Sequence, residues 1–392
     1  MLTSIALILL LGLFMGGCFK KLRLPSLLGM IITGIIISPH ALNLIDKSIL
    51  NISSDLRQIA LVVILTRAGL SLNVSDLKRV GRPAILMCFL PACAEIIGTV
   101  ILAPPLLGVS VMEAAIIGSV IAAVSPAVIV PRMIKLIDEG YGKRHSIPQL
   151  ILAGASVDDV FVIVVFTAFT GLAAEGSISA VSFLQIPVSI VLGILVGTVT
   201  GIMLVFFFKR IHMRDSVKIL IILSISFLLL ELENRLDGLV PVSGLLAIMS
   251  MGILIKQKYD VLAVRLSAKY NKIWVAAEVF LFVLVGATVD IKYALEAGVM
   301  AVILVAGAII FRMVGVYLCL LKTQLTRKER IFCMLAYTPK ATVQAAIGAI
   351  PLAMGLPCGQ TVLTVAVLSI LITAPFGAIC VDKTYMKLLE QG

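Results

Sequence analysis

The sequence predicts an all-α polytopic membrane protein with about thirteen transmembrane helices arranged as an inverted repeat. Three observations carry this prediction: an apolar composition, an alternation of charge between loops, and motifs that recur in the two halves of the chain. Of 392 residues, 60% are hydrophobic and 14% charged, whereas soluble domains are roughly half apolar and a quarter charged. We therefore expect lipid to solvate most of the apolar surface of a single membrane domain over 1–392.

Apolar runs long enough to cross a bilayer, roughly 17–25 residues each, divide the chain into thirteen segments. Their approximate bounds are 1–18, 22–39, 56–72, 84–105, 111–135, 147–172, 181–208, 216–231, 240–255, 273–289, 295–320, 329–354 and 359–381. The first run resembles a signal peptide, but its positive charges, Lys20, Lys21 and Arg23, follow the apolar stretch instead of preceding it. We interpret it as a retained helix.

Basic residues alternate between the loops on the two sides of these segments. Of the 32 lysines and arginines, 25 fall in one set of loops, four in the opposite set, and three within segments. Such an excess marks the cytoplasmic side of a membrane. We expect a multi-pass protein of the plasma (inner) membrane with its N-terminus outside and its C-terminus in the cytoplasm. The net charge of +11 then requires no nucleic-acid partner.

Three motifs recur in order in the two halves of the chain, at segments two and nine, three and ten, and five and twelve. The matching residues are Gly34 and Gly252, Gly69 and Gly286, and Pro126 and Pro339. The first interval is 35 residues in one half and 34 in the other, and the second is 57 against 53. Equivalent segments are seven apart, an odd number, so the copies cross the membrane in opposite directions. Segments 1–6 and 8–13 thus form an inverted repeat, connected by 181–208.

The fifth and twelfth segments are predicted to be discontinuous helices that cross each other. The fifth holds Pro126 and Pro131, each of which removes a backbone donor, so we expect the stretch between them to depart from helix. The twelfth holds Pro339 between polar residues. Broken backbone survives at membrane depth only where protein or a watery cavity satisfies it, which favours an ion site over two simple kinks. Hydroxyls that could line this cavity belong to Ser125, Thr338 and Thr342.

Asp158 and Asp159 stand halfway along the sixth segment, two residues after Ser156. A carboxylate in hydrocarbon costs several kcal/mol, so these residues indicate function more strongly than structure. Adjacent helical residues point about 100° apart, and the two aspartates therefore need not have the same role. A carboxylate there can hold a proton or a small hard cation on the same oxygens. That competition is the mechanism of an antiporter.

Three basic residues lie within segments. Lys340 is positioned either to neutralise one aspartate or to line the cavity alone. Arg312 lies 26 residues after Gly286, as Glu95 lies 26 after Gly69. Equivalent positions near a pseudo-two-fold axis can meet, so we predict a Glu95–Arg312 ion pair. Arg67 lies near a segment end and can snorkel.

Other residue types exclude further kinds of site. The seven cysteines lie mostly within apolar runs and indicate no disulfide framework, and no cysteine–histidine cluster has metal-ligand spacing. The three histidines fall in loops or at segment ends. No phosphate-binding glycine loop is present. We therefore expect no cofactor and no enzymatic activity.

The motifs resemble the cation/proton antiporter superfamily, and within it the sodium/proton antiporters with a paired aspartate (the NHA-type branch). The runs that carry the resemblance are Leu65-Thr-Arg67-Ala-Gly69-Leu, Ser125-Pro126-Ala with Pro131, Ser156-Val-Asp158-Asp159 and Pro339-Lys340-Ala-Thr-Val-Gln344-Ala-Ala. The resemblance covers nearly the whole chain. It implies a homodimer in which a six-helix transport core moves against a scaffold in an elevator fashion.

The resemblance also implies residue roles. Asp159 would be the main ligand of the transported cation, Asp158 its partner, and Lys340 the counter-charge to Asp158. The core would comprise 84–172 and 295–381, and the scaffold and dimer surface 1–72 and 216–289. Many electrogenic relatives have the lysine alone, whereas this chain has both Lys340 and Arg312, which leaves the stoichiometry open.

We therefore predict exchange of Na⁺ (or Li⁺) for H⁺, with a role in pH homeostasis. A K⁺/H⁺ antiporter and a Na⁺-coupled solute symporter on a related fold are the alternatives. A channel is a further alternative, which an inverted repeat with acid–base pairs does not exclude. An intramembrane aspartyl protease needs two aspartates from different helices, which the adjacent Asp158 and Asp159 cannot supply. The role of Glu278, in the tenth segment, stays open.

Overall fold

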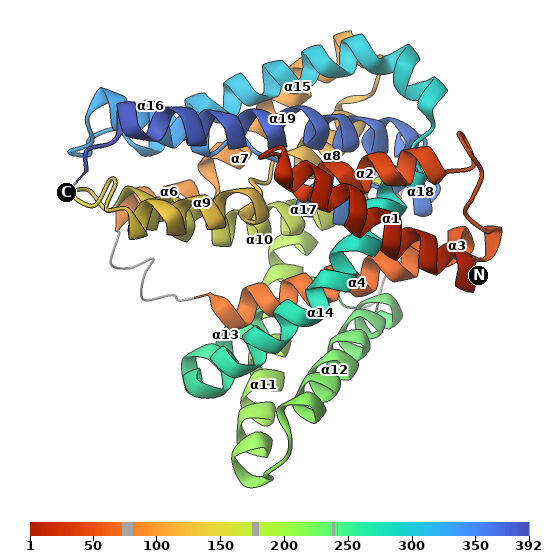
Figure 1. The fold of residues 1–392 in the computed structure, drawn as a ribbon. Helices are drawn as coiled ribbons and strands as arrows, with labels where there is room; N and C mark the ends of the chain where they lie inside the picture. Colours follow the sequence, from red (N-terminus) through yellow and green to blue (C-terminus); the bar gives the residue numbers. More distant parts are fainter. Residues whose placement is uncertain (73–80, 175–179, 237–239, 241, 392) are drawn as a thin grey trace. The chain divides into compact units, whose positions relative to one another are not determined.

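A computed structural model describes residues 1–72, 81–174, 180–236, 240 and 242–391 (Figure 1). Throughout these residues the chain is helical apart from turns, loops and one isolated bridge between Tyr141 and Gln391. Eight of the described helices or helix pairs are long and apolar enough to cross a membrane, and shorter apolar helices accompany them. The predicted all-α membrane class is confirmed.

The helices follow the order of the predicted segments. They are α1 (Leu2–Lys21), α2 (Ser26–Ile37), α3 (Lys47–Asn51), α4 (Ser53–Ser71), α6 (Arg82–Met87), α7 (Leu90–Leu107), α8 (Val111–Ile121), α9 (Pro126–Asp138), α10 (Ile147–Ala174), α11 (Ala180–Arg210), α12 (Asp215–Leu236), α13 (Gly244–Lys258), α14 (Asp260–Ala287), α15 (Ile291–Cys319), α16 (Arg327–Ala336), α17 (Thr342–Ile347), α18 (Ile350–Ala353) and α19 (Gly359–Leu388). Three predicted segments, 84–105, 111–135 and 329–354, each correspond to more than one helix.

Helix α14 begins earlier than the sequence predicted. The stretch 260–272 was expected to be a loop because of its charges, yet it forms the first half of the helix. Leu262, Leu266 and Tyr270 recur every four residues and are fully buried. This spacing places them on one helix face, while the basic residues between them lie on the others.

The chain divides into two compact units. Unit 1 comprises Met1–Ser54, Ser75–Phe169 and Val279–Gly392, and unit 2 comprises Asp55–Val74 and Thr170–Glu278. This division by packing is not the division into transport core and scaffold, which stays a prediction.

Within unit 1, α7 and α15 pack closely along one another. A Cβ at Gly98 would meet the Phe311 ring, and a Cβ at Gly315 would meet Ala94. Gly98 and Gly315 are 217 residues apart, as are Ala94 and Phe311. The two contacts are therefore the same contact made twice, once from each copy of the repeat. This is the packing expected about a pseudo-two-fold axis.

A second repeated contact occurs once in each unit. In unit 1, Gly34 of α2 packs against Gly286 of α14, and in unit 2, Gly252 of α13 packs against Gly69 of α4. The sequence repeat matches Gly34 with Gly252 and Gly286 with Gly69. Both contacts bring helix backbones together where only a hydrogen fits, as is common between membrane helices.

Both predicted discontinuous helices are interrupted. Residues 122–125 separate α8 from α9, and residues 337–341 separate α16 from α17. The second interruption contains Pro339 and Lys340, as predicted. The predicted position of the first, between Pro126 and Pro131, is wrong. Pro126 is the first residue of α9, where a missing N–H costs nothing, and Pro131 lies inside α9 without ending it.

We predict that Gly34→Ala destabilises the protein. Its new Cβ would meet backbone atoms of Val283 and Ala287, which cannot rotate away, and overpacking of this kind costs about 1–3 kcal/mol or more. The control is Gly17→Ala, also in a helix, because no atom lies within 4 Å of the added Cβ. Thermal unfolding in detergent should show a lower Tm for Gly34→Ala alone. Equal values for both variants would contradict the close contact.

Candidate functional site

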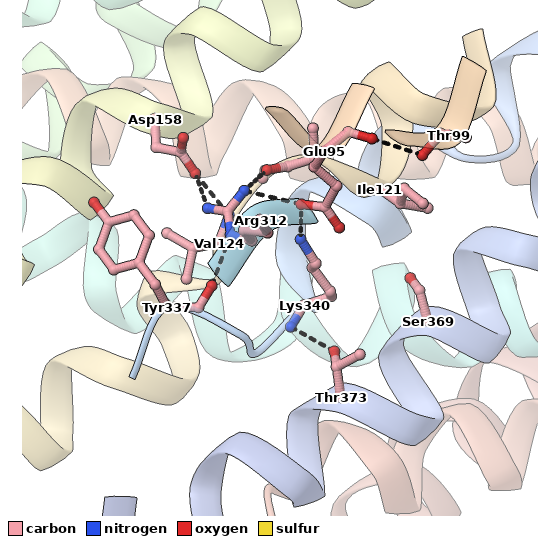
Figure 2. Close-up of polar contacts among 12 residues, drawn as sticks. Glu95, Thr99, Ile121, Val124, Asp158, Arg312, Tyr337, Lys340, Ser369 and Thr373 are labelled. Carbon is pink, nitrogen blue, oxygen red and sulfur yellow. Dashed lines mark hydrogen bonds and ion pairs between the residues drawn. The ribbon is translucent and has the colours of Figure 1, made fainter. Parts of the chain in front are cut away.

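The two interrupted helices meet in unit 1. The backbone N–H of Ser125 donates a hydrogen bond of 2.8 Å to the carbonyl of Pro339, so one break contacts the other directly. Each break frees backbone groups that a continuous helix would satisfy internally. At membrane depth these groups need partners from the protein. The side chains that supply them define the site (Figure 2).

Arg312 of α15 contacts both breaks at once. Its side chain is fully buried. Nε donates to the Tyr337 carbonyl at 2.7 Å, and Nη1 donates to the Ala122 carbonyl. Nη1 also donates to Glu95 Oε2 at 3.0 Å, and Nη2 to Asp158 Oδ2 at 2.7 Å (Figure 2). One guanidinium thus holds a carbonyl from each break and two carboxylates.

Glu95 of α7 contacts both Arg312 and Lys340. Its Oε2 accepts from Arg312 and also from Lys340 Nζ, at 2.5 Å. The structure therefore brings Glu95 and Arg312 into the contact that their equivalent positions predicted. The pairing of Lys340 with Asp158 that the resemblance implied is not the one observed. The forked guanidinium of Arg312 contacts both Glu95 and Asp158. The ammonium of Lys340 forms its ion pair with Glu95.

The freed N–H groups of the two breaks are satisfied in parallel ways. In the first break, Val124 N–H donates to Asp158 Oδ2 at 2.8 Å; in the second, Lys340 N–H donates to Thr373 Oγ1 at 2.8 Å. Asp158 lies 34 residues after Val124, and Thr373 lies 33 after Lys340. The acceptor is a carboxylate at the first break and a hydroxyl at the second.

The sequence analysis assigned no role to Thr373 or Gln344. Gln344 Oε1 accepts from Ala341 N–H at 2.8 Å, and its Nε2 donates to the Ala123 carbonyl at 2.8 Å. No spacing in the sequence singled out Thr373. The signal for Gln344 was its place three residues after the N-cap Ala341, a position from which side chains reach back to the N-cap.

Four buried oxygen atoms at or beside the breaks make no hydrogen bond within the described part of the chain. They are Ser125 Oγ, Thr342 Oγ1, Asp158 Oδ1 and Asp159 Oδ1. Among the described residues Asp159 also forms no ion pair, whereas Asp158 and Glu95 do. Two cations therefore face three carboxylates, and Asp159 is the one left over.

The remaining predicted site residues are placed as follows. Thr338 donates its hydroxyl to the Leu335 carbonyl at 2.8 Å. Ser156 lies in α10, and its side chain lies outside the described residues. Arg67 and Glu278 both lie in unit 2 and interact electrostatically.

Comparison with known proteins identifies the family of the chain. The family model described as "Sodium/hydrogen exchanger, transmembrane" matches residues 5–383. Human sodium/hydrogen exchanger 9B2 is 33% identical over 385 residues, which cover 94% of this chain and 70% of that protein. Human sodium/hydrogen exchanger 9B1 is 30% identical, with 94% and 73% covered.

A solved structure shares the fold. The sodium proton antiporter MjNhaP1 from Methanocaldococcus jannaschii superposes with a TM-score of 0.85 at 20% identity, covering 98% of this chain and 97% of that one. The family match extends over almost the whole chain, and the relatives are about one third identical over the same length. The chain therefore belongs to the family of transmembrane sodium/hydrogen exchangers, which are ion transporters and not enzymes.

Proposed function

We propose that the chain exchanges Na⁺ for H⁺ by alternating access and that Asp159 is the carboxylate on which the two ions compete. One observation carries the assignment: of the three carboxylates Glu95, Asp158 and Asp159, the last has no cationic partner among the described residues. A buried carboxylate without a partner is costly at membrane depth. Either a proton or a bound cation removes that cost.

The oxygens around the breaks suit a hard cation. Ser125 Oγ, Thr342 Oγ1 and Asp158 Oδ1 are buried and have no hydrogen-bond partner among the described residues. Hard cations prefer such oxygen ligands. We propose that the transported ion takes its ligands from these atoms and Asp159.

Asp158 has a different role from Asp159. Its Oδ2 accepts from both Arg312 and the Val124 N–H, so the negative charge of Asp158 is matched by a guanidinium that stays protonated. We therefore propose that Asp158 remains ionised throughout the cycle. It fixes the first break and offers the ion only its free Oδ1.

The charges of the site support one-for-one exchange. Arg312 and Lys340 balance Glu95 and Asp158, so the site is neutral whenever Asp159 holds one proton or one monovalent cation. The stoichiometry that the sequence left open is thus proposed to be electroneutral.

Several wider expectations remain proposals. The transport core would comprise 84–172 and 295–381, joined through 181–208 to a scaffold of 1–72 and 216–289 that forms a homodimer. The excess of basic residues in one set of loops supports an outside N-terminus in a plasma membrane. Li⁺ is proposed as a second substrate because it is a similarly hard cation. K⁺ exchange and solute symport are less favoured, since the description of the matching family names sodium and hydrogen as the exchanged ions.

We predict that Asp159→Asn abolishes exchange, because the amide cannot alternate between a protonated and a cation-bound state. Proteoliposomes with an acidic interior should lose ΔpH when Na⁺ or Li⁺ is added to the wild type, and should keep it with the variant. Asp138→Asn, at the exposed end of α9, is the control and should behave as the wild type. Cation-driven proton flux in Asp159→Asn would exclude Asp159 as the shared ligand.

We predict that the flux reverses at equal Na⁺ and H⁺ gradients whether the membrane potential is 0 or about −100 mV. A potential of this size acts on each net charge moved with about 2.3 kcal/mol, so an unbalanced stoichiometry would displace the reversal point strongly. The potential can be set with valinomycin and K⁺ in proteoliposomes. A displaced reversal point would show that a second titrating group takes part.

We predict that Arg312→Lys impairs both stability and transport although the charge is kept. An ammonium cannot reach Tyr337, Ala122 and both carboxylates at once, and each buried acceptor left unsatisfied costs about 1–3 kcal/mol. Arg144→Lys, in an exposed loop, is the matched control. Thermal unfolding and Na⁺-driven ΔpH loss measure the two effects. A variant as stable and active as the control would show that the guanidinium fork is dispensable.

A further inference from the structure

The side-chain amide of Gln344 bridges the two interrupted helices. It is almost completely buried. Its Oε1 accepts from the N–H of Ala341, in the second break. Its Nε2 donates to the carbonyl of Ala123, in the first break, and at 3.4 Å to the carbonyl of Ile121, the last residue of α8. All of these partners are backbone groups, so the amide ties one main chain to the other.

The residues that Gln344 joins stand next to free hydroxyls. Ala123 lies two residues before Ser125, and Ala341 immediately precedes Thr342. Ser125 Oγ and Thr342 Oγ1 are both buried without a hydrogen-bond partner among the described residues. Together with the Ser125–Pro339 hydrogen bond and Arg312, the Gln344 side chain therefore fixes the separation between two backbone segments that each carry an available oxygen.

We propose that Gln344 is a positioning residue of the cation site, holding the Ser125 and Thr342 segments at the spacing that the transported ion requires. The proposal rests on the proposed function, in which these hydroxyls are ligands of the transported ion. Gln344 itself does not coordinate the ion. Its effect is on the apparent affinity for the cation, through the distance between the two breaks.

Only a group that accepts on one side and donates on the other fits between the breaks. A protonated carboxylic acid has the same pattern and nearly the same shape as the amide. A carboxylate instead presents a negative oxygen to the Ala123 and Ile121 carbonyls, which repel it. Gln344→Glu therefore converts the bridge into one that is intact in acid and broken in alkali. Gln344→Met has a similar length but breaks the bridge at every pH.

The experiment compares the apparent KM for Na⁺ and the maximal rate in proteoliposomes from about pH 6 to 9, each divided by the wild-type value at that pH. The ratio removes the pH dependence of transport that the wild type and the variants share. Gln344→Met should raise KM about tenfold throughout, the effect of losing a buried hydrogen bond. Gln344→Glu should approach the wild type at the acid end and resemble Gln344→Met at the alkaline end.

The control for the added acid is Gln149→Glu, because Gln149 is an exposed amide of α10 and its ratio should stay near one at every pH. Thermal unfolding of each variant separates positioning from simple loss of fold. A KM ratio near one for both Gln344 variants would overturn the proposal. A pH-independent loss of rate that follows the loss of stability, without a change in KM, would overturn it too. A wild type without Na⁺-driven flux would contradict the proposed function itself.

Discussion

The guanidinium of Arg312 is the interaction on which the ion site depends, because two broken helices cannot meet at membrane depth without donors for their freed carbonyls. It supplies one donor to Tyr337 and one to Ala122, and its remaining contacts go to two carboxylates. Unsatisfied buried groups are more costly in a low dielectric than in water. The permanent charge that joins the two breaks is therefore also the charge that pairs with Asp158.

The hydrogen bonds of the two breaks explain why Asp158, and not Asp159, is held in place. Each break has a backbone N–H that needs an acceptor from a later helix. In the second break that acceptor is Thr373 Oγ1 of α19. In the first break the acceptor is Asp158 Oδ2 of α10, and the negative charge of Asp158 is paired with Arg312. Asp159, one residue later on the same helix, points elsewhere. Asp158 thus has a backbone partner and an ion-pair partner, whereas Asp159 forms no ion pair among the described residues.

Much of this arrangement could be predicted from the sequence. The predictions that were wrong or missing have physical causes. The Glu95–Arg312 contact followed from equal spacing within two copies of a repeat, which fixes relative position without atomic detail. The break near Pro126 was misplaced because the sequence alone does not distinguish a proline at the first position of a helix from a proline that interrupts one. Side-chain reach is not encoded in spacing, so the direct contact of Lys340 with Glu95 was not predicted and Gln344 was assigned no role.

The choice of partner for Lys340 bears directly on the chemistry of exchange. A lysine can release its proton, whereas an arginine cannot under any physiological condition. If Lys340 were the partner of Asp158, its deprotonation would free a second carboxylate beside Asp159, and two groups could titrate with the cation. In the observed network Lys340 contacts Glu95, and the permanent cation holds Asp158. A proton lost from Lys340 would leave Glu95 still paired with Arg312, so the network agrees with the proposal that Asp159 is the single carboxylate for which Na⁺ and H⁺ compete.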